Sequence, residues 1–301
     1  MFKKYKIESV ISNGSNAIVY KIKINNKYYA LRKEKIYKQD ALIHKDNFKY
    51  NKILDNTHLS IYRIIYFNEF INKINNIHFT IIYNYSIEKC SFHQPLTNTV
   101  KNDPIRLKKY NELTKSKYCF NVITDLKDGT LKEILYQLSS NQIYSMILQI
   151  LYALHLMHSN SFIHTDIHNT NILYKKTKLK KIKIFNNIII PTFGYLYSLI
   201  DYEAVFSIKY NLSEDAIKNM AMINTKYENY MSFLCKVIHG ECITIIKIIN
   251  KILYKEDIST DDISNFLYTA LSYEATKYYC LNINEPMKII KYFYKLIYKK
   301  N

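Results

Sequence analysis

Tryptophan is absent from this sequence, and glycine and proline are scarce, with four residues each among 301. Flexible linkers are usually rich in glycine, serine or proline, so this composition indicates no linker, and no repeat of fixed period divides the chain. The length is sufficient for one or two domains with a sizeable core. We therefore expect a globular protein and exclude repeat and disordered classes.

Long apolar runs without polar residues are also absent. The most apolar run, residues 182–200, contains four residues that disfavour a membrane span: Lys183, Asn186, Asn187 and Pro191. We expect strands there and no membrane span. The N-terminus, MFKKYKIESV, lacks the apolar stretch of a signal peptide. These features favour a cytoplasmic protein.

Cysteine is sparse and shows no pairing pattern. The five residues are Cys90, Cys119, Cys235, Cys242 and Cys280. Their number is odd and none forms a C-x-x-C pair, which argues against a zinc site and against a disulfide framework. We expect five free, packed thiols, as a reducing compartment allows.

Acidic residues are outnumbered, with 25 Asp and Glu against 43 Lys and Arg, a formal charge of +18. Such a charge can attract nucleic acid, membrane surfaces or acidic substrates. However, lysine, asparagine, isoleucine and tyrosine are all abundant, which indicates an AT-rich coding sequence that raises lysine without functional demand. The densest cluster, Lys175–Lys183, has little interleaved aromatic character, so base stacking is not indicated.

The chain changes from strand-like to helical patterns along its length. Alternating apolar residues predict three strands in residues 7–31, with Asn25 and Asn26 as a tight hairpin turn. We expect a helix near residues 40–54 and further strands through Tyr83. Residues 88–116, with Pro95 and Pro104, are predicted to be an irregular insertion.

The second half is predicted to be mainly helical. Ser139-x-x-Gln142 is a capping box, and the apolar residues that follow it to Met157 are spaced for one helix face. Similar helical patterns occur in residues 230–238, 245–253 and 287–296.

The sequence FIHTDIHNTNILY follows the long predicted helix. In it, His164 precedes Asp166, and Asn171 lies five residues after the Asp. This pattern resembles the catalytic loop H-x-D-x-x-x-x-N of the protein-kinase superfamily. In that chemistry one carboxylate meets the acceptor hydroxyl while an amide oxygen of the same loop meets Mg²⁺.

A second acid, Asp201, ends an apolar strand in the sequence YSLIDYE. It resembles the metal-binding D-F-G of kinases, here as D-Y-E. The resemblance implies an α+β, bilobal fold, with a small β-rich N-lobe (residues 1–124), a larger helical C-lobe (125–301) and MgATP between them. Asp166 would be the catalytic base, while Asn171 and Asp201 would hold Mg²⁺, with Mn²⁺ as an alternative ion.

The resemblance extends to the expected N-lobe. The sequence SNGSNAIVY resembles the glycine-rich loop with only the middle glycine kept, so Ser12, Gly14, Ala17 and Val19 would cover the nucleotide. The sequence YYALRK is similar to V-A-I-K. Because Ala30 and Arg32 share a strand face and Lys33 points the other way, Arg32 would contact the phosphates.

Two further N-lobe assignments follow from the resemblance. Asp46 is the expected acidic partner of Arg32, although the spacing aligns Tyr50 there. The strand before Asp128-Gly129 resembles a kinase hinge, in which Thr124 lines the adenine pocket and Asp125 and Lys127 offer backbone groups to adenine.

Departures from the family pattern leave alternatives open. Thr165 replaces the arginine of H-R-D, Glu203 replaces the glycine of D-F-G, and no A-P-E follows. The D-x-H formed by Asp166 and His168 also resembles small-molecule kinases of the aminoglycoside and choline type. A nucleotide-binding pseudokinase scaffold is a third reading, because Arg32 replaces lysine.

Within the superfamily, the sequence IPTFGYLYSLID and the AT-rich composition are similar to divergent serine/threonine kinases of large DNA viruses. That similarity implies a protein substrate and a location in the host cytoplasm or virion. The acceptor protein and the oligomeric state do not follow from the sequence.

Overall fold

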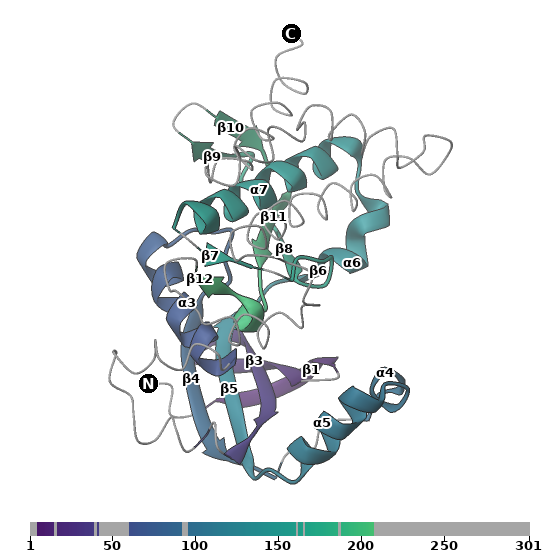
Figure 1. The fold of residues 1–301 in the computed structure, drawn as a ribbon. Coiled ribbons are helices and arrows are strands. Elements are labelled where there is room, and N and C mark those ends of the chain that lie inside the picture. Colours follow the sequence, from purple (N-terminus) through teal and green to yellow (C-terminus); the bar gives the residue numbers. More distant parts are fainter. Residues whose placement is uncertain are drawn as a thin grey trace. The chain divides into compact units, whose positions relative to one another are not determined.

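The computed structural model describes residues 5–14, 17–38, 41, 60–91, 96–160, 162–164, 166–185 and 188–207 (Figure 1). Residues 42–54, Asp46 and the three C-terminal helical patterns lie outside the described residues. The chain forms two compact units. The first comprises Met1–Ile74 and Thr80–Lys127, and the second comprises Asn75–Phe79 and Asp128–Asn301.

The first unit contains a five-stranded antiparallel sheet with the order β1-β2-β3-β5-β4. Its strands are β1 (Lys6–Asn13), β2 (Ala17–Ile24), β3 (Lys27–Ile36), β4 (Ile82–Lys89) and β5 (Tyr118–Asp125). The predicted turn between β2 and β3 is confirmed. Asn25 and Asn26 have φ values of 47° and 62°, which asparagine tolerates better than most residues.

Helix α3 (Ser60–Ile74) precedes β4. Burial and, secondarily, the Glu69 carboxylate of α3 raise the pKa of Tyr85 in β4, so the helix and this strand are neighbours. Strand β5 lies between β3 and β4 and is buried on both faces, from Cys119 to Ile123. One face carries an apolar cluster of Ile22, Ile24, Leu31 and Ile123.

The prediction of an irregular segment over residues 88–116 is wrong. Strand β4 continues to Lys89, and two helices follow, α4 (Asn98–Lys101) and α5 (Pro104–Thr114). Pro104 does not break a helix but begins one, because a proline in the first turn removes only an N–H that would lack an intrahelical partner. The Asp103 carboxylate caps that turn by accepting hydrogen bonds from the backbone N–H groups of Ile105 and Arg106 at 3.0 and 3.1 Å.

The expectation of five free thiols is wrong for Cys90 and Cys119, which form a disulfide. They are 29 residues apart in sequence, but the antiparallel pairing of β4 with β5 brings their Cα atoms to 5.8 Å. Cysteine count and local spacing contain no information about such a contact, because it depends on strand register.

In the second unit, helix α7 (Ser140–Ser159) begins at the predicted capping box. Ser139 and Gln142 form reciprocal bonds, and the predicted apolar face from Ile143 to Met157 is buried. Before α7 lie α6 (Leu131–Ile134) and the 3₁₀ helix Leu135–Gln137. The α+β class, with a β-rich part first and helices after it, is confirmed.

Three small sheets and the 3₁₀ helix Tyr202–Ala204 follow in the described part of this unit. The first has the order β11-β8-β6, formed by Tyr195–Leu199, Ile172–Lys176 and Gly129–Thr130. The second pairs β9 (Lys181–Phe185) with β10 (Ile188–Pro191), and the third pairs β7 (Phe162–Ile163) with β12 (Phe206–Ser207). The apolar run 182–200 therefore forms strands, as predicted. No helix among the described residues is long and apolar enough to cross a membrane.

Helix α7 is bonded to the strand β11 through the fully buried side chain of Gln149. Its Nε2 donates to the Tyr195 carbonyl at 3.1 Å, and its Oε1 accepts from the Tyr197 N–H at 3.0 Å. Nearby, Ser145 Oγ donates to the Pro191 carbonyl at the end of β10, at 2.7 Å. These bonds fix the strand that leads to Asp201.

Candidate active site

The kinase-like loop lies between β7 and β8, directly after α7. Strand β7 is only two residues long and pairs with β12, while β8 is held between β6 and β11. The loop is therefore anchored at both ends by sheet pairing. Asp166 is exposed, whereas Asn171 is buried.

Asp166 and Asn171 are brought together as predicted. The Asn171 amide Nδ2 donates to both the backbone carbonyl and the carboxylate Oδ2 of Asp166, each at 3.0 Å. The Asn171 backbone N–H also donates to the His168 carbonyl at 2.9 Å, which closes the loop on itself. This arrangement fixes the Asp166 carboxylate while leaving it accessible to a substrate hydroxyl.

Asp201 is tied to the same loop through its neighbour Ile200. The buried His164 ring donates from Nε2 to the Ile200 carbonyl at 2.8 Å, and the Ile200 N–H donates to the Asn171 carbonyl at 3.1 Å. Asp201 then adopts a left-handed conformation, with φ 66° and ψ 66°. Such a conformation at a non-glycine residue is costly and typical of functional sites.

His168 is a second side chain in contact with Asp166. Its Nε2 lies 3.4 Å from Asp166 Oδ2, and its Nδ1 lies 2.7 Å from Thr170 Oγ1. The hydrogen bond from His168 lowers the pKa of Asp166, and the bond to Asp166 raises the pKa of His168, with a further contribution from the Asp201 charge. Thr170 was not predicted, because its role depends on the orientation of the histidine ring.

Asn171 and Asp201 are chemically suited to hold Mg²⁺. Both hydrogen bonds from the Asn171 side chain to Asp166 use Nδ2, so the amide Oδ1 is its acceptor atom, and Asp201 adds a carboxylate. Mg²⁺ prefers such oxygen ligands and is commonly bound by one or two protein groups together with phosphate and water. Among the described residues, no cluster of three His, Cys, Asp or Glu side chains offers an all-protein metal site.

In the first unit, the register confirms that Arg32 shares a sheet face with Ala30. Arg32 pairs with Val19 and Val122, while Lys33 pairs with Ile18 and Asn121. Lys33 forms its own ion pair, at 3.2 Å, with Glu88. The two cations therefore occupy opposite faces of the sheet.

Arg32 forms an ion pair with Glu34, a residue that was not predicted. The guanidinium Nη2 lies 2.9 Å from Glu34 Oε2, and the two side chains are 23% and 9% exposed. Because side chains of a strand alternate between its faces, residues 32 and 34 lie on the same face, and this ion pair could have been predicted from the sequence. The expected partner, Asp46, lies outside the described residues.

The predicted glycine-rich loop is the hairpin between β1 and β2. Ser12 pairs with Val19, and the Gly14 N–H donates to the Ala17 carbonyl at 3.0 Å. Gly14 and Ala17 therefore close the hairpin, and Gly14 has no side chain. Such a hairpin could approach a phosphate closely.

The predicted hinge residues lie at the end of β5. Ala30 and Thr124 are cross-strand partners. The Asp125 carboxylate accepts from the Ile81 N–H at 3.0 Å and forms an ion pair with Lys127. These contacts hold the strand end in place and leave the proposed adenine contacts to the backbone.

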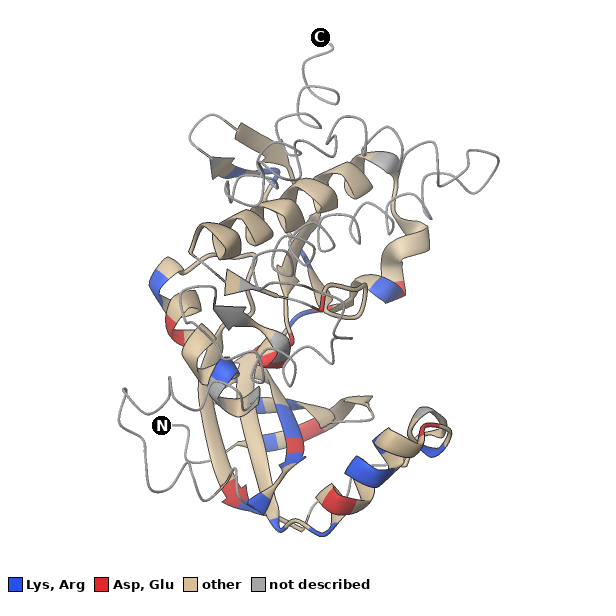
Figure 2. Cartoon of the chain, in the orientation of Figure 1, with Lys and Arg blue, Asp and Glu red and all other residues tan. Residues whose placement is uncertain are grey.

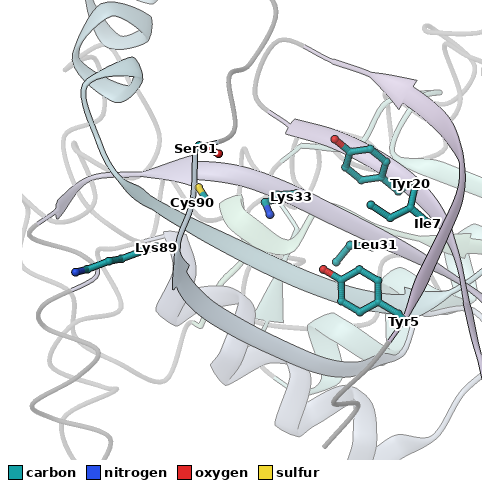
Figure 3. A pocket seen from close by; sticks show the side chains of 8 residues that line it. All are labelled: Tyr5, Ile7, Tyr20, Leu31, Lys33, Lys89, Cys90 and Ser91. Carbon is teal, nitrogen blue, oxygen red and sulfur yellow. The ribbon is translucent and has the colours of Figure 1, made fainter.

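A cavity of about 380 Å³ lies on the face of the first-unit sheet that is opposite to Arg32 (Figure 3). Leu31 and Lys33 line it, together with Tyr5, Ile7, Tyr20, Lys89, Cys90 and Ser91. A neighbouring cavity of about 500 Å³ is lined by Lys35 and residues flanking β5. Neither cavity contains a predicted nucleotide-binding residue, so neither supports the nucleotide assignment.

Comparisons with known proteins give two matches to protein kinases. A family model described as protein tyrosine and serine/threonine kinase matches residues 80–190, which include Asp166 and Asn171. A curated protein of Acanthamoeba polyphaga mimivirus, "Putative serine/threonine-protein kinase L232", is 29% identical over 202 residues. That match covers 64% of this chain and 23% of the relative, so the chain spans less than a quarter of the relative's length.

The β-rich first unit, the helix-anchored loop with Asp166 and Asn171, and these two matches agree with one another. Over residues 80–190 this chain is therefore similar to protein kinases, and its α+β class is the one expected for them.

Proposed function

We propose that this chain is a serine/threonine protein kinase that transfers the γ-phosphate of ATP to a protein hydroxyl. The observation that carries the proposal is the set of hydrogen bonds that joins Asp166, Asn171 and Ile200. These bonds fix the proposed base, Asp166, beside the proposed metal ligand Asn171, and they fix the residue that precedes the second proposed ligand, Asp201. Phosphoryl transfer depends mainly on such positioning and on neutralisation of phosphate charge.

Each residue has a separate task in this mechanism. Asp166 orients the acceptor hydroxyl and accepts its proton, and its lowered pKa keeps it ionised at neutral pH. Asn171 and Asp201 hold Mg²⁺, which when bound neutralises the charge on the phosphates. Arg32, held by Glu34, contacts the α- and β-phosphates. Ser12, Gly14, Ala17 and Val19 cover the nucleotide.

Adenine is proposed to contact the end of β5. Thr124 lines its pocket beside Ala30, and the backbone groups of Asp125 and Lys127 bond its edge. The named relative is a viral protein, and we propose that this chain likewise is viral and acts in a host cytoplasm.

The test is phosphate transfer from labelled ATP with Mg²⁺, comparing the full chain with Asp166→Asn. Asp103→Asn is the matched control, because it removes one carboxylate at a helix cap where asparagine serves as well as aspartate. Acceptors are a protein mixture, the chain itself, and a panel of amino alcohols and aminoglycosides. We expect label on protein with wild type and the control, and a loss of about 10²- to 10⁴-fold with Asp166→Asn.

Other outcomes would reject the proposal. Label confined to a small molecule would assign the chain to the small-molecule kinases, a reading that the Asp166–His168 contact favours. Stabilisation by MgATP without transfer to any acceptor would identify a pseudokinase.

A further inference from the structure

Six lysines and three large apolar side chains are exposed in a short part of the second unit, which we call the basic surface. Its members are Lys175, Lys176, Lys178, Lys180, Lys181, Lys183, Leu179, Ile189 and Phe193. No acidic residue occurs between Asp166 and Asp201. Within the described ranges, none of the six lysines takes part in an ion pair. Figure 2 shows blue positions on β9 and no red between β9 and β10.

The hairpin of β9 and β10 is amphipathic. Its inner face consists of four buried isoleucines: Ile182, Ile184, Ile188 and Ile190. On the outer face, Lys183 pairs directly with Ile189, and Lys181 pairs with Pro191. Lysine and isoleucine side chains are therefore neighbours on the exposed face.

Hydrogen bonds join the loop before β9 to the turn after β10. The Thr192 N–H donates to the Lys180 carbonyl at 3.0 Å, and Thr192 Oγ1 donates to the Leu179 carbonyl. Leu179, which is 55% exposed, and Phe193, which is 37% exposed, thus project from adjacent segments. The lysines of residues 178–183 and these apolar side chains therefore lie on adjoining segments.

Phe193 occupies a turn position that does not suit it. The Tyr195 N–H donates to the Thr192 carbonyl at 3.1 Å, and both central residues have positive φ, 47° at Phe193 and 87° at Gly194. Turns of this type favour Asn-Gly, because a bulky side chain is strained at positive φ. The backbone would be served better by asparagine, so the exposed ring has a role other than stabilising the turn.

We propose that the basic surface binds anionic lipid membranes, with the lysines at the headgroups and the apolar side chains in the interface. Clustered lysines are attracted to anionic lipid headgroups, and exposed leucine and phenylalanine beside them enter the boundary between headgroups and acyl chains. A nucleic acid would contact the lysines but would have no contact for Leu179 and Ile189, because proteins that bind single strands stack aromatic rings on the bases. The proposal is independent of phosphotransfer, because it involves no residue assigned to catalysis.

The experiment is sedimentation of the full chain, without nucleotide, with vesicles of phosphatidylcholine alone or with about 20% phosphatidylserine. We expect binding only to the anionic vesicles, weakened by salt. Each basic residue near such a surface contributes roughly fivefold in partitioning. The change of Lys178, Lys180, Lys181 and Lys183 to Gln should therefore lower partitioning by about a hundredfold or more.

Two further variants make the test specific. Changing Lys27, Lys101, Lys108 and Lys109 to Gln removes the same charge from exposed positions of the first unit, and partitioning should fall by less than about threefold. Phe193→Asn should lower partitioning by about tenfold while the melting temperature stays equal or rises. That pair of results separates membrane insertion from a folding defect.

The proposal fails if anionic vesicles do not bind the wild type, or if both lysine sets weaken binding equally. It also fails if Phe193→Asn binds as wild type does, because the apolar side chains would then stay outside the membrane. Binding of a duplex oligonucleotide without vesicle binding, lost in the first lysine variant, would identify a nucleic-acid surface instead.

Discussion

The two units preserve the kinase pattern to different degrees. In the second unit, Asp166, Asn171 and Asp201 are all present and are tied together by backbone and side-chain hydrogen bonds. In the first unit, one glycine remains in the phosphate hairpin, and Arg32 occupies the lysine position with Glu34 as a partner on its own strand. A base and metal ligands need particular atoms at particular places, whereas phosphate binding needs positive charge and close backbone approach. We infer that the second requirement can be met by several residue sets.

The largest expected effect concerns the second unit. Asp201→Asn should lower phosphotransfer by about a thousandfold or more, because a metal ligand stabilises charge worth several kcal/mol in the transition state. Glu203→Gln, a nearby acid in the following 3₁₀ helix, is the control and should retain activity. The measurement is initial rate with labelled ATP. Retention of most activity in Asp201→Asn would remove it from the metal site.

The disulfide between Cys90 and Cys119 lies in the first unit and should stabilise its folded state. Changing Cys90 and Cys119 to Ser should lower the free energy of unfolding by about 3.6 kcal/mol, the value expected for closing a loop of this length. Denaturant unfolding measures it, followed with and without reductant. Reductant should destabilise the wild type and leave the double variant unchanged. If the wild type ignores reductant, the bridge does not contribute to its stability.

Substitution of Arg32 tests whether a positive charge at this position of the first unit is sufficient for the proposed phosphate contact. Arg32→Ala should lower phosphotransfer by about a hundredfold, as loss of one preorganised charge donor does, while Arg32→Lys should retain much of the activity. Lys33→Ala, on the opposite face of the same strand, is a matched control with little expected effect. Equal activities of Arg32→Ala and wild type would show that Arg32 has no phosphate role.

The smallest expected effect is a pH dependence of stability from His168. Its pKa is raised by Asp166 and by the Asp201 charge, so its contribution is complete below about pH 6.5 and is lost as pH rises through the folded pKa. The side chain is 44% exposed, so the contribution should be below about 1 kcal/mol. Melting temperatures from pH 6 to 9 for wild type and His168→Gln should converge at high pH. Parallel curves would contradict the assignment.

Local patterns were predictable from the sequence. The capping box at Ser139, the Asn25-Asn26 turn and the face of Arg32 each depend on residues within four positions, and the structure confirms all three. The loop with Asp166 and Asn171 was noticed for the same reason, because the chemistry it resembles requires a fixed spacing, and its catalytic role stays a prediction. The pairing of Glu34 with Arg32 could have been predicted in the same way, because the two residues are two positions apart in one strand.

Features that depend on distant pairing were not predictable. The Cys90–Cys119 bond depends on the register of β4 against β5. Helix α5 was missed because Pro104 was taken as a residue that disrupts a helix, whereas with Asp103 as the N-cap it begins one. In each case the deciding contact is tertiary, or the same residue type has two opposite uses.

The Gln149 side chain has a consequence for self-association. Strand β11 lies at the edge of its three-stranded sheet, and edge strands recruit strands from other molecules through unpaired backbone groups. Gln149 occupies the Tyr195 carbonyl and the Tyr197 N–H, the two groups that an added strand would use. Together with the Leu199 N–H, which donates to the His78 carbonyl at 2.9 Å, this side chain reduces the number of backbone groups of β11 that an added strand could use.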